Sequence, residues 1–374
     1  MSDAHATLVP KFELLLEGAP VPSEVLEAII VVRARQDLEM ADLLEVRLSN
    51  LDLRWTEEDT FKEGKKLAFK CGFQEGAAPR VLVSGEIVRR ECEFPVRGPA
   101  VVTVVAMDRR HRLKRGAKSR TFLNKKDSEV ASQIAAEVGL SAEVEDSRVV
   151  HPYLLQNAQS DLAFLRERAA RIGYEVRVDN QDQKLVFKRA TTQGAPVQKL
   201  TWGLDLHSFQ GRVTTEEQVS KVVVRGWRME SKEKVVGTAS GGQAKRYDLD
   251  GAEPGHATAA RTFGQREVLV VDLPVDVPGE ATARALARLE RYAADFAQAS
   301  LSGNGHPGLE PGVLVEVDGC GARVNGSYYV SSTLHYLEPR LGYTTHCEVV
   351  RSTQTASAPP PAPLPRTLPP RAGG

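Results

Sequence analysis

The stretch LEPGVLVEVDGCGARVNGSYYVSSTLHYLEPRLGYTTHCEVVRS, residues 309–352, has a counterpart earlier in the chain. Residues 61–109 contain FKEGKKLAFKCG, VLVSGEIVRRECEF and VVTVVAMDR in the same order. Both copies read as a glycine before a strand, a glycine step into a long strand, a turn and a returning strand. We predict that Gly64 corresponds to Gly312, and that Gly85 corresponds to Gly326.

The segments before these stretches also match. IIVVRARQDLEMADLLEVRLSN (29–50) has the shape of LHSFQGRVTTEEQVSKVVVRGW (206–227), because in both two strands flank a polar connection. The alternative is that short valine-rich strands resemble one another by chance. Since four pieces recur in one order, we predict a β-domain present twice, the second copy interrupted by an insert with a long helix from Gly279 to Ser300. Three such chains would place six similar domains in a ring, a way for a trimer to meet a six-fold object.

Between the two copies, QNAQSDLAFLRERAARIGYEVRVDNQDQKLVFKR (156–189) predicts a helix followed by a hairpin. Ser160 or Asp161 is the expected N-cap, and Gly173 the expected helix stop. A second helix is predicted after an N-cap at Asp127. The arginines of the first helix are expected on its solvated face: Arg166, Arg168 and Arg171.

Composition limits the classes of partner. The chain has 374 residues, 49 basic and 49 acidic, and a formal net charge of zero. This balance argues against nucleic acid or an anionic membrane as the main partner, since both favour a basic surface. The four cysteines show no CxxC spacing and are expected to be buried thiols in a reducing compartment. Without a signal-peptide pattern or a long apolar run, we expect a soluble chain folded in the cytoplasm.

No sequence motif predicts a catalytic, cofactor or metal site, so we expect no enzyme activity. The eight histidines lack HExxH spacing. His335 and His346 lie on adjoining strands, and whether they face each other depends on the register. The basic run RRHRLKRGAKSRTFLNKK (109–126) could line a channel for nucleic acid or an acidic protein. We favour the alternative, a solvated connector between the first barrel and the helical insert.

The tyrosines of the last hairpin are candidates for packing or for a subunit contact. The equal alternative is that they simply close the second barrel. They are Tyr328, Tyr329, Tyr336 and Tyr343.

Four of these segments, in series, resemble the phage late control D family. They are QNAQSDLAFLRERAARIGYEV, VVVRGWRMESKEKVVGTAS, EATARALARLERYA and the stretch 309–352. The resemblance covers residues 8 to 353 and extends to the first part of the type VI secretion valine-glycine repeat spike protein. It implies a baseplate hub of a contractile tail: a homotrimer whose two barrels per subunit make a pseudo-six-fold ring. Such a hub adapts the six-fold tail tube to a three-fold spike.

The resemblance also implies the partners, namely further copies of the chain, the tail tube ring, a spike protein and other baseplate proteins. Here the chain departs from the spike protein, because it ends in the proline-rich ASAPPPAPLPRTLPPRAGG and not in a needle. The needle and any cell-wall lytic activity are therefore expected on separate chains. Phage tail, secretion machine and extracellular injection particle stay open as settings.

The sequence thus predicts a mainly β fold with α+β inserts and two similar small β-barrels. We place a flexible N-terminus at 1–7, barrel one at 8–115 and an α+β insert at 116–192. Barrel two combines 193–226 with 303–353, around an insert at 227–302, and a disordered tail covers 354–374. The alternatives are a cell-wall-degrading enzyme of the same particle and a monomeric ligand-binding β-protein.

Overall fold

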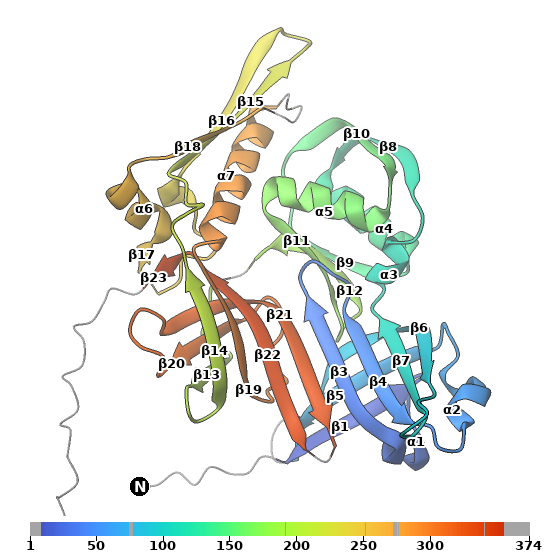
Figure 1. Ribbon diagram of the computed structural model, residues 1–374. Helices are drawn as coiled ribbons and strands as arrows, with labels where there is room; N and C mark the ends of the chain where they lie inside the picture. Colours follow the sequence, from blue (N-terminus) through green and yellow to red (C-terminus); the bar gives the residue numbers. More distant parts are fainter. Residues whose placement is uncertain are drawn as a thin grey trace, which may run out of the picture.

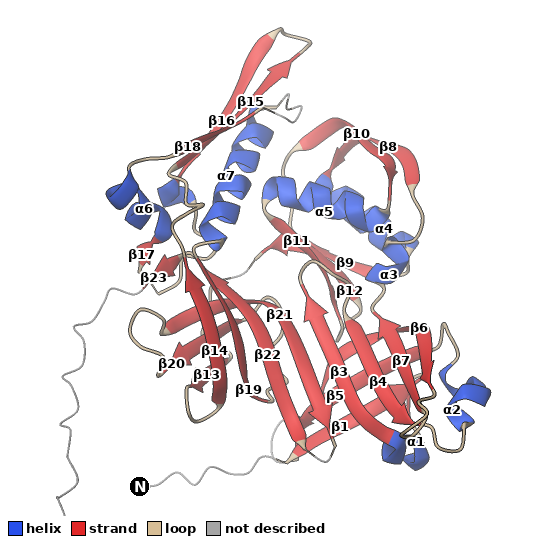
Figure 2. Cartoon of the chain, in the orientation of Figure 1, coloured by secondary structure: helices blue, strands red, loops and turns tan. Residues whose placement is uncertain are grey.

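The computed structural model describes residues 9–354 except 75–77, 191, 251, 272–274, 276 and 340 (Figure 1). The predicted N-terminal extension at 1–7 and all but the first residue of the predicted tail lie outside the described residues. The fold is mainly β, as predicted, and its longer helices lie in the inserts (Figure 2). Two small barrels lie side by side, and the inserts lie at one end of them.

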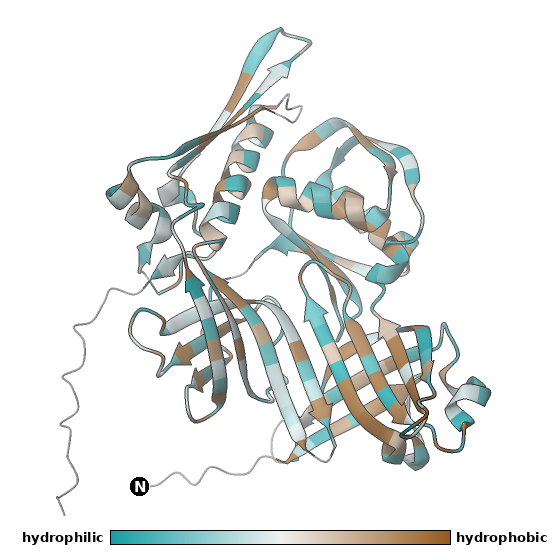
Figure 3. Ribbon diagram, viewed as in Figure 1, coloured by the Kyte–Doolittle hydropathy of each residue, from teal (hydrophilic) through white to brown (hydrophobic). Residues whose placement is uncertain are grey.

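Barrel one comes from the first part of the chain, and its strands are joined by short helices and turns. Alternating apolar side chains of β3, β4 and β7 fill its core, and in Figure 3 brown apolar bands lie between teal polar ones along β3 and β4. The core includes Phe61 and Phe69, which are fully buried. Its elements are β1 (Pro10–Leu16), β2 (Ala19–Pro20), α1 (Ser23–Ala28), β3 (Ile29–Asp37), β4 (Leu43–Ser49), α2 (Arg54–Glu57), β5 (Lys66–Phe73), β6 (Arg80–Glu93) and β7 (Val101–Met107).

Barrel two repeats this arrangement. Its strands are β13 (Gln198–Thr201), β14 (Leu206–Val213), β19 (Ala297–Asn304), β20 (Leu314–Asp318), β21 (Gly326–Glu338) and β22 (Gly342–Arg351). The spatial order β14-β19-β22-β21-β20-β13 matches the order β3-β4-β7-β6-β5-β1 of barrel one, with chain order preserved. One difference is that β13 pairs with β20 in parallel, whereas β1 pairs with β5 antiparallel.

Irregularities of the ladders recur at matching places. The β3–β4 register shifts between Ile29 and Val31, and the β14–β19 register shifts between Leu206 and Ser208. Likewise, β6–β7 shifts after Ile87 and β21–β22 shifts after Val330. A bulge is a specific backbone feature rather than a general property of valine-rich strands. Its recurrence supports a duplicated domain over chance likeness of strands.

Two pairs of glycines were predicted to be equivalent in the repeat, and the structure makes one pair equivalent and not the other. Gly64 (φ +91°) donates to Ile87 O at 2.7 Å, and Gly312 (φ +99°) donates to Val330 O at 2.9 Å, so these two glycines are equivalent. Gly85 pairs with Leu67, three residues after Gly64, whereas Gly326 pairs with Val317, five residues after Gly312. The predicted correspondence of Gly85 with Gly326 therefore differs from the register by two residues.

The boundaries of barrel two differ from the prediction. KVVVRGW, placed in the barrel from its sequence, is β15 (Lys221–Arg228) and pairs with β16 (Glu233–Ser240) and β18 (Glu267–Val270) in a separate sheet. The barrel strand equivalent to β4 is β19, which follows the long helix α7 (Pro278–Ala294). The helix therefore ends six residues before the predicted Ser300. The sequence AQASLSGN alternates buried and exposed residues, which is the period of a strand.

The first insert packs two helices on small sheets. In α5 (Asp161–Ile172) the Ser160 side chain accepts from the Ala163 amide at 3.2 Å, and Gly173 ends the helix at φ 72°, as predicted. Lys126, not Asp127, occupies the N-cap of α4 (Asp127–Glu137). The insert's other elements are α3 (Arg110–Leu113), β8 (Lys118–Lys126), β9 (Ser141–Val144), β10 (Val150–Gln159), β11 (Tyr174–Asp179) and β12 (Lys184–Arg189).

The second insert interrupts barrel two between β14 and β19. Helix α7 covers one face of the β16-β15-β18 sheet and also packs on α5 of the first insert. The β15–β16 hairpin extends beyond the rest of the molecule at the top of Figure 1. The smaller elements are β17 (Glu253–Pro254), α6 (Gly255–Phe263) and β23 (Thr353–Gln354), which pairs with β17.

Candidate functional site: the domain junction

The two barrels are joined through a continuous sheet. The second half of β21 pairs antiparallel with β3, from Ser332 opposite Asp37 to Leu337 opposite Val32, which makes one 13-stranded sheet of both barrels. Leu337 is 1% exposed and lies in the core of barrel one. Barrel two therefore closes the core of barrel one as well as its own.

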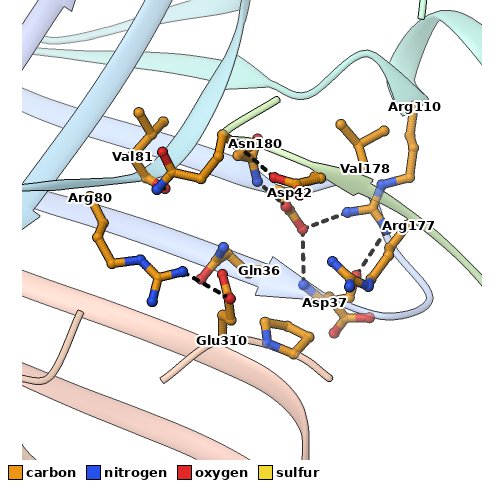
Figure 4. Close-up of a pocket in the computed structure, with 13 residues that line it drawn as sticks. Gln36, Asp37, Asp42, Arg80, Val81, Arg110, Arg177, Val178, Asn180 and Glu310 are labelled. Carbon is orange, nitrogen blue, oxygen red and sulfur yellow. Dashed lines mark hydrogen bonds and ion pairs between the residues drawn. The ribbon is translucent and has the colours of Figure 1, made fainter. Parts of the chain in front are cut away.

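Beside this seam lies a small polar cavity of about 90 Å³ where barrel one, the β11–β12 hairpin and barrel two meet (Figure 4). Its inner wall is built on Asp42. Arg110 Nη2 lies 2.5 Å from Asp42 Oδ1, and Asn180 Nδ2 donates to Asp42 Oδ2 at 2.6 Å. Since Asn180 belongs to the first insert, its hydrogen bond to the Asp42 carboxylate joins the insert to barrel one.

Arg110 holds a second carboxylate at the same place. Its Nε donates to Asp108 Oδ2 at 2.8 Å, and its Nη1 donates to the Asp37 carbonyl at 2.9 Å. Arg110 is 1% exposed, and Asp108 is fully buried. A buried charge is tolerated when it is paired and hydrogen-bonded. The groups satisfy one another, so the arrangement holds the β3–β4 turn, α3 and the hairpin in fixed positions.

The prediction of a solvated connector for residues 109–126 is therefore wrong for Arg110. Other basic side chains of the run are ion-paired. Arg112 binds Glu86, and Lys118 and Arg120 both bind Asp161, at 2.6–2.8 Å. These contacts hold the run against barrel one and the first insert. The paired charges give no support to a basic channel along this run.

A second buried ionic cluster joins the two inserts. Arg168 Nε lies 2.5 Å from Asp127 Oδ1, and His151 Nε2 lies 3.3 Å from Asp127 Oδ2. Glu280 of α7 lies 3.9 Å from His151 and binds Arg284 at 2.6 Å. Burial opposes the charge on Asp127, but the hydrogen bonds from His151 and Arg168 outweigh it, so the pKa of Asp127 is lowered.

Arg168 corrects the prediction of a wholly solvated arginine face, because it is only 4% exposed. Arg166 does face outward, paired with Glu39 at 3.3 Å. A signal was present in the sequence. Arg168 is three residues after Leu165 and four before Ile172, on the apolar stripe of the helix. Asp108 and Arg110 gave a weaker signal, as charged residues directly after the buried strand VVTVVAM.

The four candidate tyrosines lie at contacts within the chain. Tyr329 donates to Glu175 of the first insert at 2.9 Å, and its ring packs on Tyr247 of the second at 5.3 Å between centroids. Tyr343 belongs to the core of barrel one. Tyr328 donates to the Val324 carbonyl at 2.7 Å, and Arg33 of barrel one lies over the Tyr336 ring at 5.6 Å. A role of these residues between subunits stays a prediction.

His335 and His346 do not face each other. His335 pairs with Thr345 and is fully buried, whereas His346 pairs with Leu334 and is exposed. His335 Nε2 lies 3.0 Å from the Leu309 carbonyl, and its Nδ1 lies 2.8 Å from the Tyr343 hydroxyl. Burial lowers the pKa of His335 to about 3. It is a neutral core histidine whose hydrogen-bond partners belong to the barrel-two segment.

The structure shows neither a metal-binding cluster nor a membrane-spanning helix within the described residues, and it separates the cysteines by burial. Among the described residues, no three His, Cys, Asp or Glu side chains gather closely enough to hold a metal ion. Cys71 and Cys347 are buried, but Cys92 is exposed and Cys320 is half-buried, so the prediction of four buried thiols is wrong for these two. No helix within the described ranges is long and apolar enough to cross a membrane.

Comparison with known structures defines the fold as that of phage tail proteins. The chain is similar to the 43 kDa tail protein of prophage MuSo2 from Shewanella oneidensis, at 15% identity and a TM-score of 0.68, covering 92% of this chain and 98% of that one. A tail protein from Neisseria meningitidis MC58 gives 13% identity, a TM-score of 0.66, and 92% and 97% coverage. The E. coli c3393 protein, a type VI secretion system component, gives 12%, 0.57, and 93% and 80%.

The chain itself belongs to the Alg8 N-terminal domain family, whose family model matches residues 6–338. This is not the late control D family named by the resemblance, although the structural neighbours share the predicted kind of fold. Comparison with curated protein sequences gave no match.

Proposed function

We propose that the chain is a structural baseplate hub of a contractile tail or injection system. In this role a homotrimer adapts the six-fold tail tube to a three-fold spike. The single observation that carries the proposal is the duplication: two barrels of one topology, joined edge to edge within each chain. A trimer then presents six similar barrels to the tube while keeping three-fold symmetry for the spike.

The likeness of the fold to phage tail proteins and to a type VI secretion component supports this role. The tube ring, a separate spike protein and other baseplate proteins are the proposed partners. We also propose that the chain acts without turnover, as a component of an assembled particle. The buried ionic clusters fit such a role, because their charged groups are paired with one another and hold the domains in place.

The test is the solution mass of the purified full chain by light scattering across a range of concentrations, alone and with a candidate spike protein added. A species near three times 40.9 kDa in either condition is expected. A monomer in both conditions at every concentration would overturn the hub and favour a ligand-binding β-protein. Release of soluble fragments from purified cell-wall material would contradict the absence of turnover.

A further inference from the structure

We infer that neighbouring copies of this chain are joined by pairing of β6 of one copy with β14 of the next, in the register of β21 with β3. This inference rests on the proposed trimer and assigns its interface. The partner is a second copy of the chain, and the argument comes from the duplicated fold.

The equivalence of the strands fixes which edges should meet. The strand order of the two barrels makes β6 the equivalent of β21, and β3 the equivalent of β14. Within the chain, β21 of barrel two pairs with β3 of barrel one. The same contact between chains brings β6 of barrel one to β14 of a neighbouring barrel two. Strand pairings within one chain and strand pairings between two chains then alternate around the ring.

Within the described part of the chain, both edges lie open where the transferred register would use them. Among the described residues, Arg89–Glu93 of β6 pair with β7 alone, and Ser208–Val213 of β14 pair with β19 alone. Residues 91–99 are exposed, as is most of β14. An open strand edge presents unsatisfied N–H and C=O groups to another strand. The edge of β21 that corresponds to Arg89–Glu93 is the one that β3 covers.

The bulges allow the register to be transferred residue by residue. Matching bulges make Ile87 of β6 equivalent to Val330 of β21, and Leu206 of β14 equivalent to Ile29 of β3. Counting along the strands from these residues transfers each pair of the β21–β3 ladder to β6–β14. Leu334 opposite Arg35 becomes Glu91 opposite Arg212 of the next copy. This places opposite charges across the seam, which favours this register over its neighbours.

Phe94 gives the second, independent observation. By the same count it is the equivalent of Leu337, which is 1% exposed in the core of the adjoining barrel. Phe94 is 59% exposed in the single chain. In the transferred register it lies opposite Phe209, which is partly buried against the core of barrel two. An exposed phenylalanine at this position has a physical reason once the next copy covers it.

Cysteine cross-linking of the full chain tests the register. In a Cys92→Ser background, the pair Glu91→Cys and Arg212→Cys should give a reducible cross-link between chains on mild oxidation, because directly opposite residues are within disulfide reach. Glu91 and Arg212 lie on strands separated by most of the sheet within one chain, so the bond cannot form internally. The matched control joins Glu91→Cys to Glu230→Cys, in the distant β15–β16 turn, and should give no such product.

The outcomes separate the two proposals. Covalent dimers and trimers with no larger species support both the seam and the closed ring. A trimer by light scattering without specific cross-linking overturns the seam and leaves the hub proposal standing. An open ladder of ever larger species supports the seam but overturns the closed ring, since a head-to-tail contact that does not close makes filaments. A monomer that never cross-links overturns both.

Phe94→Asp provides a test that does not depend on disulfide chemistry. Because the side chain is exposed in the monomer, the variant should fold and yet weaken association by about tenfold or more per seam. Phe263→Asp on α6, where the phenylalanine is 77% exposed, is the matched control and should associate as the wild type does. Equal association of the two variants would overturn the role of Phe94.

Discussion

At the scale of the residue, buried arginines of this protein hold neighbouring elements together through ion pairs. Arg110 joins α3 to the β3–β4 turn, and Arg168 joins α5 to α4. In each case the guanidinium meets carboxylates with several hydrogen bonds, which offsets the cost of removing the charges from water. Removing one partner of such an ion pair should lower the free energy of unfolding strongly, because the other charge is then left buried and unpaired.

We therefore predict that Arg168→Leu lowers the free energy of unfolding by about 3–5 kcal/mol. Asp127 would lose its bidentate partner in a site where it is 2% exposed. Denaturant unfolding followed by circular dichroism measures the change. Arg166→Leu, on the outward face of the same helix, is the control and should change stability by less than about 1 kcal/mol. Equal effects of the two variants would contradict the assignment.

The second residue-scale prediction concerns pH. The pKa of His335 is lowered to about 3 from 6.5, so between these values the unfolded chain binds a proton that the folded chain does not. Stability from this site is therefore complete above pH 6.5 and is lost as the pH falls, by up to about 1.4 kcal/mol per unit. His335→Gln should flatten the pH dependence of unfolding in this window. His346→Gln, exposed on the same strand pair, should leave the wild-type slope unchanged.

At the scale of the element, each barrel depends on a glycine that starts its long hairpin. Gly64 and Gly312 both have positive φ, and both donate to the strand that follows the turn. A side chain in this conformation is strained although there is space for it, since no atom lies within 4 Å of a Cβ at Gly64. The two sites are structural copies, so they should respond alike.

We predict that Gly64→Ala and Gly312→Ala each destabilise the chain by about 1–2 kcal/mol. Thermal or denaturant unfolding of the single variants measures the cost. Gly242→Ala is the control, because Gly242 lacks a positive φ and an added Cβ meets open space. A large cost at one glycine of the pair and none at the other would argue against their equivalence.

At the scale of the whole molecule, the second insert is attached to barrel two as a separable unit. Val213 of β14 and Ala297 of β19 are register partners, so the insert leaves and re-enters the barrel at adjacent positions. The core of barrel two is built from barrel residues alone, and the insert has a core of its own. The two units meet where Tyr247 packs on Tyr329, where Ser327 donates to Asp250, and where β17 pairs with β23.

We therefore predict that replacing residues 214–296 by an Asn-Gly turn leaves both barrels folded and able to associate, since this turn closes an antiparallel strand pair. Stability should fall, because Tyr329 loses Tyr247. Circular dichroism and light scattering of the shortened chain measure both effects, beside a variant that keeps the insert and carries Tyr247→Ala. An unfolded product would show that the insert is needed for barrel two to fold.

The same three scales show what the sequence could predict. Local signals sufficed for the hairpin at 174–189, for the Ser160 cap and for the Gly64–Gly312 pair, because each depends on residues close in the chain or on a repeated pattern. They failed for KVVVRGW, whose apolar run is equally suited to a barrel strand and to a sheet covered by α7. A short buried strand does not identify its partners.

The sequence by itself determined a duplicated, mainly β fold, since periodic apolar residues and turn glycines act locally and recur in order. It could not place Arg110 beside Asp42, 68 positions away, or Arg168 beside Asp127, because ion pairing depends on which surfaces folding brings together. Only the tertiary structure decided that β19 and not β15 completes barrel two, and that β21 joins the barrels at β3. Strand pairing is set by long-range register, which one strand's composition does not encode.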